Sequence, residues 1–183
     1  MGDQARIDEF SEYAVARQSH LPHTAYLLCG DWHGAQDLTQ TALLNLCKAW
    51  KRAKRADSVD AYAQKTLINA YLRGQRKLRR ERELSAAALS GAERLAGSSD
   101  PDRLETRLAL LSALDRLPAR ARAVVVLRYW EDLSVAATAA ALGCSTGNVK
   151  SQSARALARL RTLLGDEFPD HGPRVGAEGK ALT

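Results

Sequence analysis

Apolar residues recur at helical spacing along most of the chain, and this pattern predicts an all-α protein. Between residues 7 and 28 the spacing fits one or two helices, with Pro22 marking a kink or a break. After a turn at residues 30–34, a second amphipathic helix is predicted from Leu38, Ala42, Leu43, Leu46, Cys47 and Trp50. Ser58 can cap a third helix, whose apolar stripe comprises Tyr62, Leu67, Ile68, Tyr71, Leu72 and Leu78.

Helical periodicity then fades over residues 83–103, where small residues and the breakers Gly91, Gly97 and Pro101 indicate a flexible linker. It returns in a helix from about Arg103 to Leu117, which Pro118 ends, and in another from Ala119 to Trp130. The pattern therefore predicts two small helical domains, at 1–82 and 104–165, followed by a disordered tail at 166–183.

Residues 133–150 have the layout of a helix-turn-helix. Ser134 and Ser145 can each cap a helix, Gly143 suits a left-handed turn, and Val149 falls where the second helix would pack on the first. A helical wheel puts small and basic side chains on the outward face, which could enter a major groove: Lys150, Ser151, Ala154 and Arg155, with Gln152 as a further donor. The alternative is a plain αα-hairpin with a solvated face.

The chain of 183 residues carries a net charge of +6, concentrated in two blocks. Twelve Lys and Arg against three Asp and Glu give +9 over residues 48–82, and residues 119–165 carry +5. Two separate basic blocks favour two surfaces for a polyanion, although solvated charged faces would give the same count. In the first block, Tyr62, Tyr71 and Asn69 accompany the basic residues, which suits unstacked single strands unless the tyrosines are core residues.

Several classes of protein are disfavoured by what the sequence lacks. The longest apolar runs are far below the length of about 20 residues that a bilayer requires, so we expect a cytoplasmic protein without a membrane partner. We find no phosphate loop, HExxH or GxSxG motif, and therefore predict neither catalysis nor a cofactor. Cys29, Cys47 and Cys144 lack metal or disulfide spacing, and a zinc site at His20, His23, Cys29 and His33 is disfavoured because no finger pattern fits.

Taken in order, these motifs resemble the extracytoplasmic-function (ECF) group of bacterial sigma-70 factors, and the composition suggests an actinobacterial source. The resemblance covers about residues 6–165 and rests on Ala35–Thr41 with Trp50, the helix at 62–80 with Asn69, the linker, Leu117–Pro118 and the helix-turn-helix. It implies regions 2 and 4 of a sigma factor that binds core RNA polymerase and directs promoter-specific initiation. Such a factor recognises minus-35 and minus-10 elements and helps to open the DNA.

The resemblance also implies site residues. Contacts to the largest catalytic subunits of core polymerase would come from Asp37, Leu38, Gln40, Leu43 and Trp50, although Gln36 and Thr41 stand where family members commonly carry acidic residues. A loop at 51–57 would capture a flipped base, and minus-10 contacts would come from Lys51, Arg52, Tyr62, Asn69, Arg73, Arg76, Arg79 and Arg80. Minus-35 contacts would come from Lys150, Ser151, Gln152, Ala154 and Arg155. An anti-sigma factor is a further partner that the resemblance admits.

Two other functions remain open on the residues alone. A helix-turn-helix repressor or activator would bind duplex DNA by itself, but it would need a ligand or dimerisation domain. If the protein were an adaptor that sequesters another sigma factor, neither basic surface would have a function.

Overall fold

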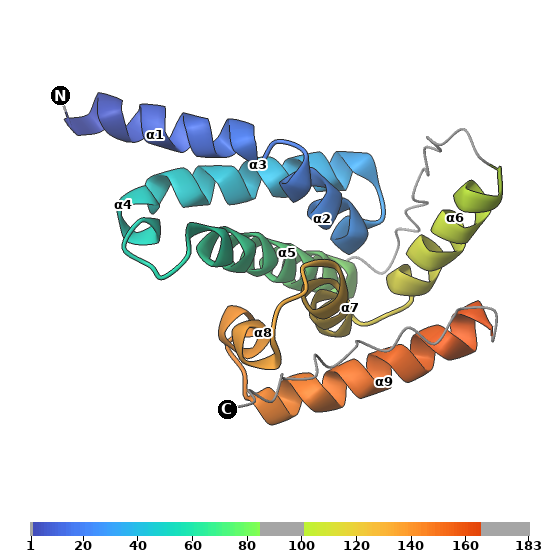
Figure 1. Ribbon diagram of the computed structural model, residues 1–183. Coiled ribbons are helices and arrows are strands. Elements are labelled where there is room, and N and C mark those ends of the chain that lie inside the picture. The colour runs from blue at the N-terminus through green and yellow to red at the C-terminus, as the bar shows by residue number, and fades with distance from the viewer. Residues whose placement is uncertain (1, 85–100, 166–183) are drawn as a thin grey trace, which may run out of the picture.

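The computed structural model describes residues 2–84 and 101–165, and all regular elements in these ranges are helical (Figure 1). The N-terminal unit consists of α1 (Gly2–Ala16), α2 (His20–Cys29), α3 (Trp32–Lys48), α4 (Trp50–Ala53) and α5 (Val59–Leu84). The C-terminal unit consists of α6 (Pro101–Asp115), α7 (Ala119–Val125), the π-helical turn η1 (Val126–Trp130), α8 (Val135–Leu142) and α9 (Thr146–Leu164). Residues 85–100 of the predicted linker and the predicted tail at 166–183 lie outside the described residues.

The break between the first two helices falls at residues 17–19, not at Pro22. Pro22 is the third residue of α2, where a backbone N–H would have no partner within the helix, so the proline is tolerated there. The turn predicted through Gly34 is wrong, because Asp31 caps α3 by accepting from the Gly34 N–H at 2.6 Å. A Cβ at Gly34 would lie 2.9 Å from the Asp31 carboxylate, so glycine leaves room for this cap.

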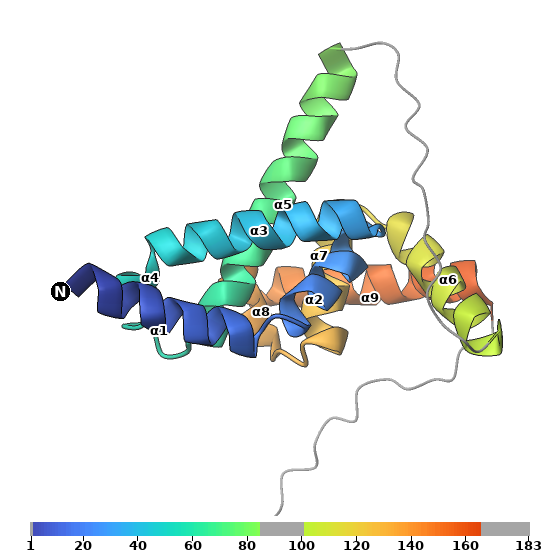
Figure 2. The ribbon, with the colours of Figure 1, turned by 90° about the horizontal axis from the view of Figure 1, so that it is seen from above.

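The prediction for the third helix is confirmed at its start and wrong near its end. Ser58 caps α5 by accepting from the Ala61 N–H at 3.2 Å, and Leu67, Ile68 and Tyr71 are buried. Leu78 continues the apolar stripe in the sequence but is 45% exposed. The reason is that the C-terminal half of α5 projects away from the body, as Figure 2 shows.

The two units share one core. The residues that form it come from α2, α3 and α5 on one side and from α6, α7, η1, α8 and α9 on the other, among them Leu28, Leu38, Leu67, Ile68, Val124, Leu127, Leu142 and Val149. Smaller clusters lie within each unit, around Trp50 in the first and around Leu114 and Leu160 in the second. The sequence pattern predicts two domains but not this packing of one on the other.

Arg122 of α7 adds a buried polar contact between the units. Its guanidinium donates to the Leu28 carbonyl at the end of α2 at 2.8 Å, and to Asp115 at the end of α6 at 2.9 Å. Carbonyls in the last turn of a helix lack partners within the helix, and a buried guanidinium is a strong donor to them.

Gly143 ends α8 with φ at 60°, in the left-handed region where a Cβ is unfavourable, although nothing lies within 4 Å of such a Cβ. We expect Gly143→Ala to lower the free energy of unfolding by roughly 1 to 2 kcal/mol, through backbone strain alone. Chemical denaturation measures this change.

Gly74 provides the matched control, because it lies inside α5 and also has nothing within 4 Å of a Cβ. There the same substitution should stabilise the protein by about 1 kcal/mol. Equal effects of the same sign at both positions would contradict the role given to the turn.

Candidate nucleic-acid and polymerase interfaces

The helix-turn-helix predicted at residues 133–150 is confirmed. Ser134 caps α8 by accepting from the Ala137 N–H at 3.0 Å, and Ser145 caps α9 by accepting from the Asn148 N–H at 3.2 Å. Val149 is completely buried against the first helix. These contacts fix where α9 begins and which of its faces is left outside.

The outward face of α9 is small and basic. The exposed residues on it include Gly147, Lys150, Ser151, Ala154, Arg155 and Ala158. Arg155 Nε donates to the Ser151 carbonyl at 3.2 Å, which holds the guanidinium along the helix. Gln152 is half-buried, and its side-chain amide donates to Asn148 Oδ1 at 3.3 Å. A face without bulky side chains allows close approach to base edges, and the polar groups on it are suitable donors to bases or phosphates.

The basic block of α5 forms a second exposed face. At about 100° per residue, the side chains opposite the buried Leu67 and Tyr71 fall within about 60° of one another: Tyr62, Asn69, Arg73, Arg76 and Arg80. Tyr62 and Asn69 are half-buried and the three arginines are exposed, whereas Arg79 is exposed but lies to one side. Tyr71 is a core residue, and burial raises the pKa of its hydroxyl to about 12.

The segment at 51–57, predicted as a loop, begins as a helix. Residues 50–53 form α4, with Trp50 and Ala53 buried and Lys51 and Arg52 exposed. Helix α1 anchors this segment, because Lys54 pairs with Glu9 at 2.6 Å and Phe10 packs edge-on to Trp50. The hydrogen bond from Lys54 holds the pKa of the Glu9 carboxyl below its usual value.

Helix α3 presents a separate exposed face at Asp37, Gln40, Thr41, Leu44 and Lys48, and Gln36 is exposed at its edge. Leu38 and Trp50 are 8% and 4% exposed, so these two predicted polymerase contacts are core residues here. Leu43 is half-buried against the shared core. Leu44, which the sequence analysis did not select, is 62% exposed between polar neighbours. The sequence did contain a signal for Leu44, because it lies seven residues after Asp37 and therefore on the same side of the helix.

Two of the three histidines considered as zinc ligands have other partners. His20 Nε2 lies 3.6 Å from Glu131 Oε2, and His23 Nδ1 lies 2.6 Å from the Ser19 carbonyl. Burial raises the pKa of the Cys29 thiol to about 12. Within residues 2–84 and 101–165, no group of three His, Cys, Asp or Glu residues is placed to hold a metal ion. No helix in the same ranges is long and apolar enough to cross a membrane.

Comparisons with known proteins show the family to which the chain belongs. The models for "Sigma-70 region 2" and "Sigma-70, region 4" match residues 15–81 and 107–160. The chain is 40% identical over 159 residues to an RNA polymerase sigma-E factor of Streptomyces coelicolor, covering 85% of this chain and 86% of that protein. It is 35% identical over 166 residues to the ECF RNA polymerase sigma factor SigM of Mycobacterium tuberculosis, covering 90% and 80%.

A solved structure shares the fold. The sigma factor RpoE of Bartonella quintana, determined in complex with the anti-sigma factor NepR, superimposes with a TM-score of 0.69 and 24% identity. The match covers 87% of this chain and 98% of that one. The two family models, in chain order, and the relatives that share them identify the chain as a member of the ECF group of sigma-70 factors, which direct RNA polymerase to promoters.

Proposed function

We propose that three surfaces of this sigma factor make different contacts during initiation: one with core polymerase, one with the minus-10 strand and one with the minus-35 duplex. The observation that carries the proposal is that each surface is exposed on the side of its helix or helices that faces away from the buried clusters. The polymerase and the promoter are in the cytoplasm, where we place the protein. The chain provides binding and positioning, and we assign it no catalysis and no cofactor.

The first surface, on α3, docks on the largest catalytic subunits of core polymerase. Asp37 and Gln40 supply exposed polar groups, and Leu44 supplies an exposed apolar contact on the same side of the helix. Leu38 and Trp50 support the surface from beneath, because they fix α3 and α4 in the core. Leu43, half-buried, lies at its edge.

The second surface, on α5 and α4, receives the minus-10 strand as it separates. Its exposed arginines and Lys51 and Arg52 neutralise phosphates, and Tyr62 and Asn69 meet unstacked bases. Arg79, beside this face, extends the positive charge. The C-terminal half of α5 projects from the body, so a strand can reach that half from several directions (Figure 2).

The third surface, the outward face of α9, reads the minus-35 element as a duplex. Lys150, Ser151 and Arg155 reach bases or phosphates, Ala154 leaves room for the groove, and Gln152 stands beside them. An anti-sigma factor, the partner of the Bartonella protein in its structure, is the proposed regulator that would compete for one or more of these surfaces.

Replacing Asp37 and Gln40 with alanine should weaken binding to core polymerase about tenfold, a joint loss of about 1.4 kcal/mol, because both side chains lie within the proposed docking surface. Both side chains are exposed, so the fold should be intact. Titration of labelled protein against core polymerase measures the affinity.

The matched control is Glu12→Ala with Gln18→Ala, which removes one carboxylate and one amide from exposed positions in α1 and the turn after it, outside the α3 surface. That pair should leave the affinity unchanged. An unchanged affinity for the Asp37 and Gln40 double variant as well would overturn the docking assignment. Leu44→Ala, tested alone, should weaken binding in the same direction.

A further inference from the structure

One face of α1 reaches both ends of the short segment that joins α4 to α5. Glu9, Tyr13 and Arg17 are spaced at i, i+4 and i+8, so they lie on one side of the helix and extend over about 12 Å along it. Arg17 follows the last residue of α1, and its N–H donates to the Tyr13 carbonyl at 3.1 Å, which continues the helical spacing. The joining segment comprises residues 54–58 and is exposed.

At the α4 end of the joining segment, Glu9 holds Lys54. Glu9 Oε2 lies 2.6 Å from Lys54 Nζ and also accepts from Trp50 Nε1 at 3.4 Å. The rings of Phe10 and Tyr13 pack against the Trp50 ring, with centroids 5.5 and 5.4 Å away. Helix α1 therefore contacts this end through an ion pair and through a cluster of aromatic rings.

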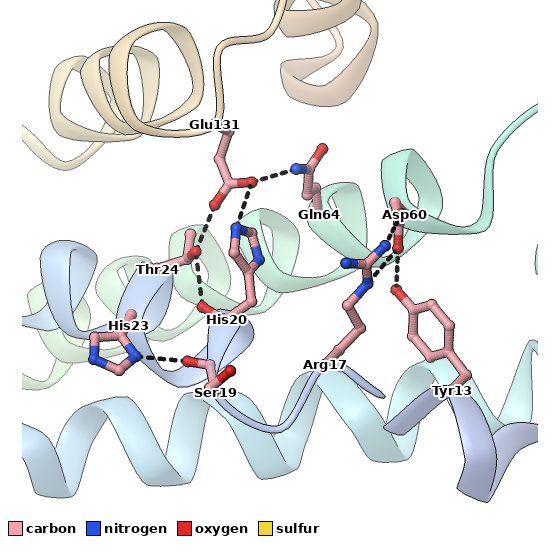
Figure 3. Close-up of polar contacts among 9 residues, drawn as sticks. All are labelled: Tyr13, Arg17, Ser19, His20, His23, Thr24, Asp60, Gln64 and Glu131. Carbon is pink, nitrogen blue, oxygen red and sulfur yellow. Dashed lines mark hydrogen bonds and ion pairs between the residues drawn. The ribbon is translucent and has the colours of Figure 1, made fainter. Parts of the chain in front are cut away.

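At the α5 end, Asp60 accepts from two side chains, as Figure 3 shows. Tyr13 Oη donates to Asp60 Oδ1 at 3.0 Å, and Arg17 Nε donates to the same oxygen at 2.9 Å. A second guanidinium nitrogen of Arg17 pairs with Asp60 Oδ2. Burial raises the pKa of the Tyr13 hydroxyl, which therefore stays protonated as a donor. Because a guanidinium that bonds both carboxylate oxygens fixes orientation as well as distance, the first turn of α5 is oriented by α1.

These ion pairs matter more for geometry than for the stability of the fold. The side chains of Arg17 and Asp60 are 41% and 45% exposed, and those of Lys54 and Glu9 are 47% and 48% exposed. Ion pairs in contact with water add little to the free energy of unfolding. The buried cluster around Trp50 keeps α1 in place, and the ion pairs determine where the two ends of the joining segment lie.

We propose that Glu9, Tyr13 and Arg17 form a brace that fixes α4 relative to the start of α5, and that this brace makes the minus-10 surface selective for its bases. The inference rests on the proposed minus-10 surface, because residues 54–58 join the parts of that surface on α4 and α5. A surface held in one shape fits one sequence of bases, whereas a mobile surface adapts to several. The three brace residues lie on α1, outside the minus-10 surface, so they are positioning residues.

A variant without the brace combines Glu9→Gln, Tyr13→Phe and Arg17→Gln. It removes both ion pairs and the tyrosine hydroxyl, retains the ring that packs on Trp50 and leaves the net charge unchanged. Holoenzyme that contains the variant is titrated against melted promoter fragments in which each minus-10 position carries each base in turn. The ratio of affinities for the preferred base and the next best base should fall about fivefold at one position or more, because the loosened surface adapts to both. The affinity for core polymerase should be unchanged.

Glu12→Gln with Arg159→Gln is the matched control. It also replaces one carboxylate and one guanidinium by amides without changing the net charge, at exposed positions outside the brace. This control should keep the wild-type ratio at every minus-10 position. Equal losses of discrimination in the control and in the variant without the brace would contradict the proposal.

Exchanging the charges at the α4 end tests whether the ion pair itself is responsible. Glu9→Lys opposes two cations and should lower the discrimination ratio, and adding Lys54→Glu restores an ion pair of reversed sense and should raise the ratio again. A double variant no more selective than Glu9→Lys would overturn the role of this pair. Circular dichroism monitors folding in parallel. If the triple variant fails to fold, Arg17→Gln alone removes the ion pair at the α5 end.

Hydrogen exchange in the free protein supplies a readout that does not depend on DNA. The Ala56 N–H donates to the Ala53 carbonyl and the Tyr62 N–H to the Ser58 carbonyl, each at 3.1 Å. Without the brace these two amides should exchange about tenfold faster, because the segment opens more often, while exchange in α9 should be unchanged. Unchanged exchange of both amides in the triple variant would overturn the brace.

Lys51→Ala with Arg52→Ala tests the minus-10 surface separately from the brace. Both side chains are exposed on α4, so this pair should weaken binding of the melted fragments. If it leaves binding unchanged, the minus-10 assignment of α4 fails, whatever the exchange rates are. If it weakens binding while the triple variant keeps the wild-type ratio at every position, the surface is upheld and the brace is overturned.

Discussion

Lys150→Ala with Arg155→Ala should weaken binding of the holoenzyme to a duplex promoter by roughly 2 to 6 kcal/mol, or about 30-fold or more at fixed salt. Both side chains lie on the exposed face of α9, where each can contact a base edge or a phosphate. A promoter whose minus-10 region is already melted should not restore binding, because the lost contacts are to duplex DNA upstream. Footprinting and titration on duplex and melted templates measure the difference.

Arg116→Ala with Arg159→Ala removes the same charge from exposed positions of the C-terminal unit outside that face. This control should cost much less, and what it costs should vanish as salt is raised, because only long-range attraction is lost. The assignment of α9 to the duplex would fail if the two double variants lost equal affinity. If either lost side chain reads a base, sequence preference at the minus-35 element should also relax.

Asn69→Ala with Arg76→Ala should impair promoter opening while leaving the closed complex largely intact. These residues lie on the face of α5 opposite the core, where their polar groups can hold bases that have left the stack. A base that stacks on an aromatic side chain gains about 1 to 3 kcal/mol, and we expect a loss at the lower end of this range for each of these two polar side chains, so opening should slow by about tenfold. A melted template should restore a large part of the activity.

The control for this pair is Gln75→Ala with Lys77→Ala, which also removes one amide and one cation from α5 but from other sides of the helix. Opening should be close to normal in that variant. Permanganate reactivity of unpaired thymines reports opening, and run-off transcription reports activity. Equal rescue of the α9 and α5 double variants by the melted template would contradict the assignment of duplex binding to α9 and of strand capture to α5.

Local signals explain why the helix-turn-helix could be predicted closely. The two serine caps, Gly143 and Val149 all lie within residues 134–149, so their spacing specifies the structure. The Asp31 cap is equally local, but a glycine pair at positions 30 and 34 suggested a longer turn. At that position the Asp31 carboxylate, which caps α3, determines where the helix begins, and the glycines do not.

Long-range packing explains most of what the sequence did not predict. Leu38 and Trp50 fit both the docking motif and the apolar stripe of the predicted helix, and their burial in the structure assigns them to the core. Leu78 follows the same period as Leu67, but the body ends before it. The contact of Glu131 with Gln64 joins residues 67 positions apart, and no spacing rule within one helix could indicate it.

The π-helical turn determines which changes in length the chain should tolerate there. The Glu131 N–H donates to the Val126 carbonyl at 3.0 Å, five residues back, so this turn holds one residue more than an α-helical turn. Removing one residue from 126–130 would let the backbone close as an ordinary α-helical turn, and would leave the carboxylate that follows on about the same side of the helix. We therefore expect this turn to tolerate the loss of one residue better than a regular α-helical turn does, and exposed Tyr129 and Trp130 are the residues whose removal should disturb packing least.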